Sequence, residues 1–217
     1  MRSQQSGFTL VEIAIVLVII GLLLGGILKG QELINSAKVK NLANDFRVIP
    51  TYIYAYQDKF KALPGDDVAA VTHLGATCAA PCANGNGNGV INGNWDSVAQ
   101  GDESYQFWAH VRIANLAAGP TLLTDAEYVP KNNVGGKIGV SSGTAAQMHI
   151  TGMTGTYQVC SKGVLGKFVK QLDIQMDDGK TESGSMRATA DTNAVGSAAE
   201  LTTNIDEALP YTVCMTF

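Results

Sequence analysis

The sequence predicts an α+β protein in which one long N-terminal helix packs on an antiparallel β-sheet head. Three observations support this fold class. An apolar run begins at Phe8, an amphipathic pattern continues it to about residue 60, and short glycine-bounded segments rich in β-forming residues begin near residue 134. The 217 residues leave room for one domain and an appendage. We therefore expect a single head with a helical extension.

The composition favours a protein that works outside the cytosol. The chain has 15 basic and 19 acidic residues and a net charge of -4, so it lacks the broad basic surface that binds nucleic acid, and no nucleic-acid partner is expected. Its 24 glycines and its charged fraction of 16% suit a loop-rich extracellular body. In such a body, the four cysteines suggest two disulfides.

The apolar run covers residues 8–28, where Thr9 and Glu12 are the clearly polar members. A helix of this length would span about 31 Å, which matches the hydrocarbon core of a bilayer. A secretory signal peptide would have a shorter apolar region followed by a cleavage site of small residues. Here a further helical pattern follows instead. We therefore expect a membrane-spanning helix.

The carboxylate of Glu12 is unusual in such a helix. An ionisable group at the bilayer centre costs about 2.5–3.5 kcal/mol and needs a partner. One interpretation places Glu12 near the interface, where its side chain reaches water. The other gives the carboxylate a partner inside the apolar environment, and the residues that precede Glu12 favour this second interpretation.

The segment MRSQQSG followed by FTLVE resembles the leader and processing site of type IV prepilins and pseudopilins. The resemblance implies cleavage after Gly7 and N-methylation of Phe8 as the new amino terminus. It also implies that Glu12 pairs with the amine of a neighbouring subunit during filament assembly, because desolvated charges without partners are costly. Many major pilins have a proline after the first apolar stretch, whereas this chain has glycines there, so pilus and pseudopilus both stay open.

The resemblance divides the chain into four parts. Residues 1–7 are a cleaved leader, residues 8–28 a transmembrane and filament-core helix, residues 29–60 its amphipathic continuation, and residues 61–217 a globular, extracytoplasmic, pilin-like head. In the continuation, apolar residues recur at spacings of three and four and need a surface to bury them. These residues are Leu42, Phe46, Ile49, Ile53, Tyr56 and Phe60.

Turn signals and periodicity divide the head into short elements. A helix capped by Asp66 or Asp67 is expected after the turn at residues 62–67. A second helix is expected over residues 102–120, with His110 and Arg112 facing solvent. Further along the chain, the pattern predicts strands and one more helix. The strands are expected within residues 134–143, 145–153, 155–162, 184–190 and 208–217, and the helix over residues 164–176.

Two of the cysteines lie close together in the sequence. Cys78 and Cys82 flank a small turn-forming segment, and a disulfide between them would close a short loop. A zinc pair is the alternative, but this spacing without a second pair of ligands falls short of a zinc site. Four cysteines allow three pairings. Sequence proximity selects Cys78 with Cys82 and leaves Cys160 with Cys214, and the resemblance supports this choice, because pilins commonly have a carboxy-terminal disulfide.

An asparagine- and glycine-rich segment follows Cys82. Oxygen-bearing side chains recur there at alternate positions, as in an EF-hand-like calcium loop, and Asp96, Asp102 or Glu103 could supply the missing charge. We favour a turn without an ion, for which no cofactor is required, and keep weak calcium binding as the alternative. The candidate calcium ligands are Asn84, Asn86, Asn88, Val90, Asn92 and Asp96.

Two further features of the sequence are candidate sites. Asp177 and Asp178 form a second candidate cation site, for which a solvated helix end is the favoured interpretation. The three histidines, His73, His110 and His149, are isolated from any nucleophile or second base, so no catalytic residue is expected and the chain is not expected to be an enzyme.

Taken as a whole, the resemblance implies a structural subunit of a type IV pilus-like filament. Its precursor would lie in the bacterial inner membrane, and the mature subunit in the periplasm or in a cell-surface filament. The implied partners are other pilin subunits, the prepilin peptidase/methyltransferase, an inner-membrane assembly platform, and the membrane before assembly. The alternative is a minor pilin or type II secretion pseudopilin that acts as an adhesive or calcium-dependent binding module.

Overall fold

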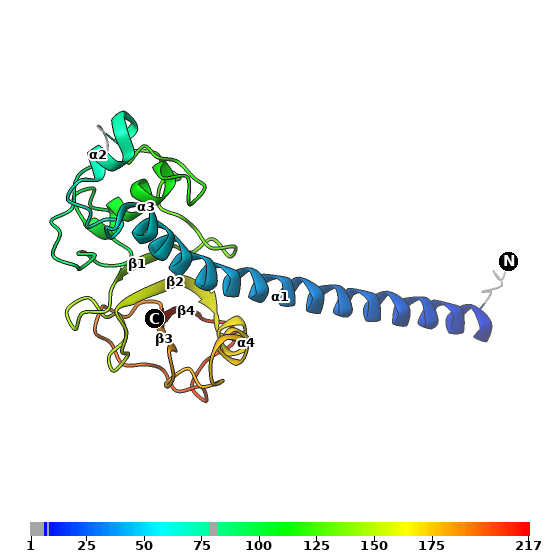
Figure 1. Ribbon diagram of the computed structural model, residues 1–217. Helices are drawn as coiled ribbons and strands as arrows, with labels where there is room; N and C mark the ends of the chain where they lie inside the picture. The colour runs from blue at the N-terminus through cyan, green and yellow to red at the C-terminus, as the bar shows by residue number, and fades with distance from the viewer. Residues whose placement is uncertain (1–6, 8, 79–81) are drawn as a thin grey trace. The chain divides into compact units, whose positions relative to one another are not determined.

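The computed structural model describes residue 7, residues 9–78 and residues 82–217 (Figure 1). The chain forms two compact units, Met1–Lys38 and Val39–Phe217, which are described separately. The elements, in chain order, are α1 (Leu10–Phe60), α2 (Ala70–Leu74), the 3-10 helix η1 (Gly75–Cys78), α3 (Glu103–Ile113), β1 (Ile138–Ser142), β2 (Tyr157–Leu165), α4 (Gly166–Met176), β3 (Met186–Ala190) and β4 (Pro210–Thr216).

The first unit consists, among its described residues, of the first part of α1. Every residue from Thr9 to Lys29 is exposed, including all the large aliphatic side chains of the apolar run. Leu, Ile, Val and Ala keep the segment helical. The glycines at positions 21, 25 and 26 have open space where a Cβ would stand. The unit therefore has an apolar surface and no core of its own within the residues described.

The second unit begins with the rest of α1, whose apolar stripe faces the core. The stripe predicted from the sequence is buried from Leu42 to Tyr56, and Phe60 is half-buried. The helix runs through Pro50 and ends at Phe60, where Lys61 takes a left-handed backbone conformation with φ of 55°. The expected end near residue 60 is thus observed.

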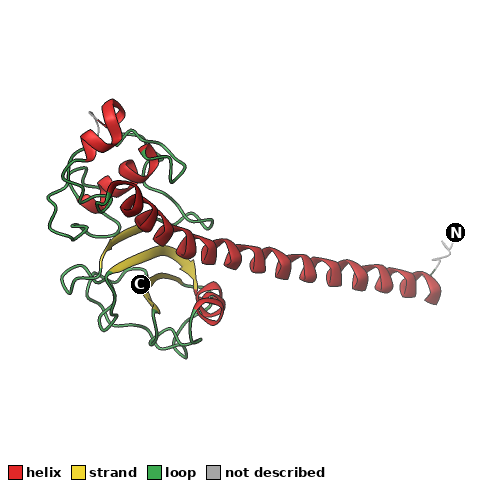
Figure 2. Ribbon diagram, viewed as in Figure 1, coloured by secondary structure: helices red, strands yellow, loops and turns green. Residues whose placement is uncertain are grey.

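The strands, yellow in Figure 2, form one four-stranded antiparallel sheet, whose order is β1-β2-β4-β3. Val140 pairs with Val159, and Cys160 pairs with Cys214 in the register of the two central strands. A long N-terminal helix and an antiparallel sheet make an α+β, pilin-like architecture, which confirms the predicted fold class. Helix α4 contacts β2, β3 and β4, and α3 contacts β1.

Two of the predicted head elements are wrong in type or extent. Residues 145–153 form no named strand; the chain turns after Thr144, and Ile150 makes one isolated bridge to Ser197. Helix α3 stops at Ile113, well before Gly119, because Asn115 takes a left-handed conformation with φ of 61°. Local turn chemistry thus replaced the predicted strand and ended the helix earlier than the apolar pattern indicated.

The prediction that His110 and Arg112 face solvent is also wrong. Both side chains are buried, at 0% and 5% exposure. The Arg112 guanidinium lies over the rings of Trp108 and Tyr128, and its Nη1 donates hydrogen bonds to the carbonyls of Pro120 and Tyr128. The segment after α3 folds back over this helix face and supplies these acceptors. A buried polar group is tolerated where it finds such partners.

Candidate functional site

At the start of α1, Thr9 and Glu12 are joined by reciprocal hydrogen bonds. The Thr9 backbone N–H and hydroxyl both donate to Glu12 Oε2, at 2.8 Å and 2.7 Å. In return, the Glu12 N–H donates to Thr9 Oγ1 at 3.3 Å. This is the capping-box arrangement that satisfies the free amides of a helix N-terminus. The sequence analysis missed this role of Thr9, although the Thr-x-x-Glu spacing was visible.

The apolar segment behind Glu12 has the properties of a membrane span. By length and composition, α1 is long and apolar enough to cross a bilayer, with a mean hydropathy of 2.8 over its most apolar window. None of that window is buried within the chain. Large contiguous apolar surfaces mark contact with a membrane or with a protein partner.

The predicted processing site lies at the very start of this segment. Gly7 is exposed, and nothing lies within 4 Å of the position where a Cβ would stand. Phe8, the predicted methylated amino terminus, lies outside the described residues, as do the first six residues of the predicted leader. Processing therefore stays a prediction.

The asparagine-rich loop is organised around the buried carboxylate of Asp66. Asp66 Oδ1 accepts hydrogen bonds from the N–H groups of Gly87 and Asn88, at 2.6 Å and 3.2 Å, and Oδ2 accepts one from Gly89 at 2.7 Å. Gly87 and Gly89 have φ of 71° and 80°, which suits glycine. Asp66 is thus a partner of the loop amides. Helix α2 begins after Ala69 and has no side-chain cap, so the prediction that Asp66 or Asp67 caps this helix is wrong.

A second buried carboxylate, that of Glu103, holds both sides of the same loop. Glu103 Oε1 accepts a hydrogen bond from the Asn86 N–H at 3.0 Å. Its Oε2 accepts from the Asn92 backbone N–H and from Asn92 Nδ2, both at 2.9 Å. Asp66 and Glu103 therefore bind backbone and side-chain donors across the loop. Sequence reasoning named Glu103 only as an alternative source of charge for a calcium loop.

The candidate calcium ligands are mostly engaged in local hydrogen bonds. Asn86 Oδ1 accepts from the Asn88 N–H, and Asn88 Oδ1 accepts from the Val90 N–H, each two residues on. Asn84 Oδ1 accepts from the Val71 N–H. An asparagine side chain that accepts from the N–H two residues later, as Asn86 and Asn88 do, is typical of an Asx turn.

The last candidate, Asp96, lies apart from this hydrogen-bond network. The described hydrogen bonds join the loop to Asp66 and Glu103, and none of them joins it to Asp96. The charge of Asp96 acts instead on the buried His149. Calcium binding by the loop stays a prediction, as the alternative to a hydrogen-bonded turn.

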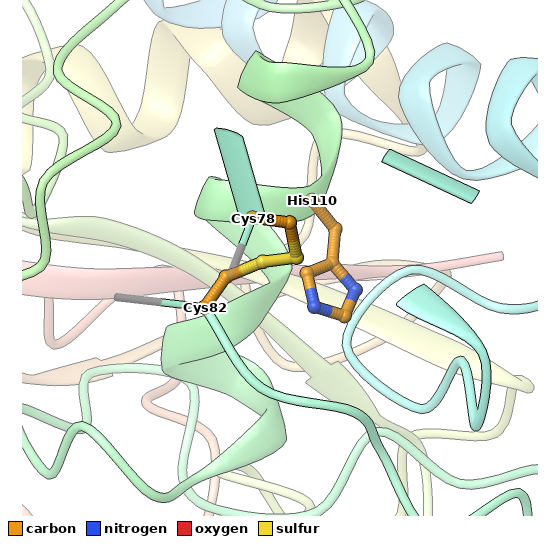
Figure 3. A group of neighbouring side chains, drawn as sticks. All are labelled: Cys78, Cys82 and His110. Carbon is orange, nitrogen blue, oxygen red and sulfur yellow. A yellow bond between two sulfur atoms is a disulfide. The ribbon is translucent and has the colours of Figure 1, made fainter. Parts of the chain in front are cut away.

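The structure contains two disulfides, Cys78–Cys82 and Cys160–Cys214, which is the pairing selected from the sequence. The first lies beside the ring of His110 (Figure 3). His110 is not free to bind a metal there, because its Nδ1 accepts a hydrogen bond from the Gly65 N–H at 2.9 Å and its Nε2 lies 3.0 Å from the Ala83 carbonyl oxygen. Burial lowers the pKa of His110, which favours the neutral ring.

Other buried ionisable groups carry shifted pKa values. Burial raises the pKa of Asp45 and of Asp173 to about 6. Burial acts in the same direction on Asp67, but hydrogen bonds from His73, from the Ala69 N–H and from the Tyr56 hydroxyl outweigh it and hold the Asp67 pKa below its ordinary value. The hydrogen bond from Tyr56 links α1 to the segment that follows the turn.

Comparison with known proteins adds one finding. The family model described as the prokaryotic N-terminal methylation motif matches residues 2–28. No curated protein and no solved structure matches the chain. The matched residues are those in which the sequence analysis found the leader, the processing site and the apolar helix. Residues 2–28 therefore carry the signature of the type IV pilins and pseudopilins.

Proposed function

We propose that the chain is a structural subunit of a type IV pilus-like filament. It is made as a membrane-inserted prepilin, cleaved after Gly7, N-methylated at Phe8 and assembled through its apolar helix. The observation that carries this proposal is the methylation motif at residues 2–28 together with an apolar helix that is exposed along its whole first part.

The exposed helix supplies the driving force for assembly. Burying apolar surface is worth about 25 cal/mol per Å², and the large apolar side chains between Leu10 and Leu28 are all exposed. The bilayer buries them before assembly, and the apolar segments of neighbouring subunits bury them afterwards. The same surface thus serves insertion and polymerisation in succession.

Glu12 fixes the register of neighbouring subunits. Both Thr9 hydrogen bonds go to Glu12 Oε2, so among the described residues Oε1 is left for the amine of a neighbouring Phe8. Cleavage places that amine four residues before Glu12 in each chain. A carboxylate moved out of water requires a compensating cation, which makes misaligned packing costly.

This function defines the remaining partners and places. The precursor lies in the bacterial inner membrane, meets a prepilin peptidase/methyltransferase and an assembly platform there, and passes into a filament that crosses the periplasm to the cell surface. The chain acts as a building block and not as an enzyme, and it requires no cofactor for assembly.

The test is the intact mass and amino-terminal sequence of the protein in a sheared surface fraction. We expect a chain that starts at methylated Phe8. Gly7→Val should block cleavage and keep the full chain in the membrane, whereas Gly26→Ala, at another exposed glycine with open space around it, should be processed normally. An uncleaved wild-type chain confined to the membrane would contradict the proposal and leave a membrane-anchored module.

A further inference from the structure

Three carboxylates meet at the C-terminal end of α4. Asp173 lies in the last turn of the helix, Asp177 is its C-cap residue, and Asp178 follows. One carboxylate oxygen from each lies within 4.8 Å of those of the other two. The sequence analysis considered Asp177 and Asp178 and favoured a solvated helix end. The structure adds Asp173, one helical turn earlier on the same face.

Asp173 differs from an ordinary solvated acid at a helix end. Its side chain is buried, with 1% exposure. The N–H groups of Gly179 and Lys180 hydrogen-bond to its carboxylate, but among the described residues its Oδ1 has no hydrogen-bond partner. Leaving a buried polar oxygen without a partner is costly, and native proteins rarely do so. A buried oxygen without a partner, in one of three clustered carboxylates, therefore indicates a missing ligand that carries positive charge.

The other two carboxylates are held in place by a protein donor on each oxygen. Asp177 Oδ1 accepts a hydrogen bond from the Ser185 hydroxyl at 3.2 Å, and Asp178 Oδ1 accepts one from the Lys180 N–H at 2.8 Å. Asp177 Oδ2 accepts a hydrogen bond from the Met186 N–H at 2.8 Å, and Asp178 Oδ2 accepts one from the Ser183 hydroxyl at 2.7 Å. A Cβ at Gly184, whose φ is 70°, would clash with the Asp177 carboxylate, so glycine permits this close approach. Each carboxylate oxygen has a second lone pair that can bind a cation.

The negative charges of the cluster are only partly balanced, because the charge of Lys180 acts on Asp178 alone among the three. No lysine or arginine forms an ion pair with any of the three carboxylates in the part of the chain that the structure describes. The C-terminal end of a helix adds partial negative charge from its free carbonyls. Three acids and a helix C-terminus would therefore repel one another without a cation between them.

We propose that Asp173, Asp177 and Asp178 form a calcium site at the C-terminal end of α4. The ligands are all carboxylate oxygens, which hard divalent cations prefer, whereas zinc prefers nitrogen and sulfur ligands. A helix end joined to an irregular loop provides an adaptable cage, which suits calcium better than the strict octahedron that magnesium requires. Water completes the coordination on the exposed side of Asp178. This site is independent of filament assembly.

Calorimetric titration of the full chain in detergent micelles with calcium chloride tests the proposal. The wild type should bind calcium with a Kd of about 0.1–1 mM, the range of weak extracellular sites, and should melt at a higher temperature when calcium is present. Asp173→Asn and Asp178→Asn should each weaken binding by at least about tenfold. Magnesium chloride, titrated in parallel, should bind more weakly than calcium.

The matched control is Asp45→Asn, a second burial-shifted aspartate that lies outside the cluster. It should bind calcium like the wild type. In calcium-free buffer, Asp173→Asn should melt no lower than the wild type, because the change removes a buried charge that Asp177 and Asp178 repel, and this separates ligand loss from misfolding. Absence of calcium binding by the wild type, or binding that survives unchanged in both Asp173→Asn and Asp178→Asn, overturns the proposal.

Discussion

The two halves of α1 have the same secondary structure and opposite surroundings. Leu17, in the first unit, is 63% exposed, whereas Phe46, in the second, is fully buried. The second half is amphipathic and its apolar stripe packs in the core of the head. The first half is apolar all round, so one stripe of contacts could not bury it. A helix of this kind needs a surrounding apolar medium, which a single chain of this size does not supply.

The comparison separates stability from assembly. Apolar side chains in Val39–Phe217 stabilise the head itself, because they leave water when that unit folds. Those in the first half can contribute to the membrane-bound or polymerised state without changing how the head folds. Substitutions in the two halves should therefore affect different measurements, and the following predictions are ordered from the largest expected effect to the smallest.

The largest effect is expected from Glu12→Ala. Removing the carboxylate should leave insertion and cleavage intact and reduce filament yield by at least about tenfold, because the neighbouring amine loses its partner. The mass of sheared filaments, divided by the amount of membrane-bound subunit, measures this yield. Glu12→Gln is the discriminating control, because glutamine keeps the capping box with Thr9 but has no charge. If Glu12→Gln assembles normally, Glu12 acts as a cap and the charge-pairing account is wrong.

Phe46→Ala should have the largest effect on the head. Truncating a fully buried aromatic side chain lowers the free energy of unfolding by about 3–5 kcal/mol. Leu17→Ala, in the exposed half of the same helix, should change it by less than about 0.5 kcal/mol. Denaturant unfolding of the chain in micelles, followed by near-ultraviolet circular dichroism, measures both. Equal losses in the two variants would remove the distinction between the halves.

Asp66→Ala should destabilise the asparagine-rich loop. The change leaves the N–H groups of Gly87, Asn88 and Gly89 without their acceptor, at a cost of about 2–3 kcal/mol in unfolding free energy. Asn88→Ala, which removes one exposed side-chain acceptor, should cost less than about 1 kcal/mol. Amide hydrogen exchange at residues 87–89 provides the local measurement. Unchanged protection there in Asp66→Ala would show that the loop does not depend on this carboxylate.

The smallest expected effect is the contribution of His149 to the pH dependence of the free energy of unfolding. Burial lowers the pKa of His149, with smaller contributions from Lys162 in the same direction and from Asp96 and Asp191 against it. The unfolded chain then binds a proton more readily than the folded one. This residue's contribution to stability is therefore complete above the ordinary histidine pKa of about 6.5 and is lost as the pH falls toward the lowered folded value.

His149→Gln provides the comparison for this effect. The melting temperatures of the wild type and the variant should differ by an amount that changes between pH 7.5 and pH 5. The wild type should lose more stability on acidification, by about 1.4 kcal/mol of unfolding free energy for each unit between the folded and unfolded pKa values of His149. Asp45 and Asp173, whose pKa values burial raises to about 6, titrate in both proteins and cancel in the difference. A pH-independent difference would mean that His149 titrates alike in both states.

The sequence predicted those features that depend on neighbours along the chain. The apolar run, the processing motif and the amphipathic stripe have a period or a spacing that can be read directly. The T-x-x-E capping box at Thr9 was equally local and was overlooked. Residues 145–153 were predicted as a strand because β-forming residues alternate there, but the turn after Thr144 decides the backbone.

The candidate sites depended on distant contacts and were harder to predict. Asp66 and Glu103 are separated from the loop amides they bind by 11 to 23 residues, so no local pattern assigns them. The burial of Asp173 depends on how α4 packs on the sheet, although its spacing of four from Asp177 was readable. Nothing in the sequence near His110 indicates that Gly65 and Ala83 supply its partners.

By itself, the sequence determined the long N-terminal helix, the position of Glu12 within it and the antiparallel sheet of the head. These features follow from the hydrophobic period and from local motifs. The tertiary structure decided which polar groups are buried and what they bind. His110, Arg112 and Asp173 all look like surface residues in the sequence, and each is buried in the fold. The reason is physical: periodicity reports which face of an element is apolar, whereas burial of a polar side chain depends on partners from elsewhere in the chain.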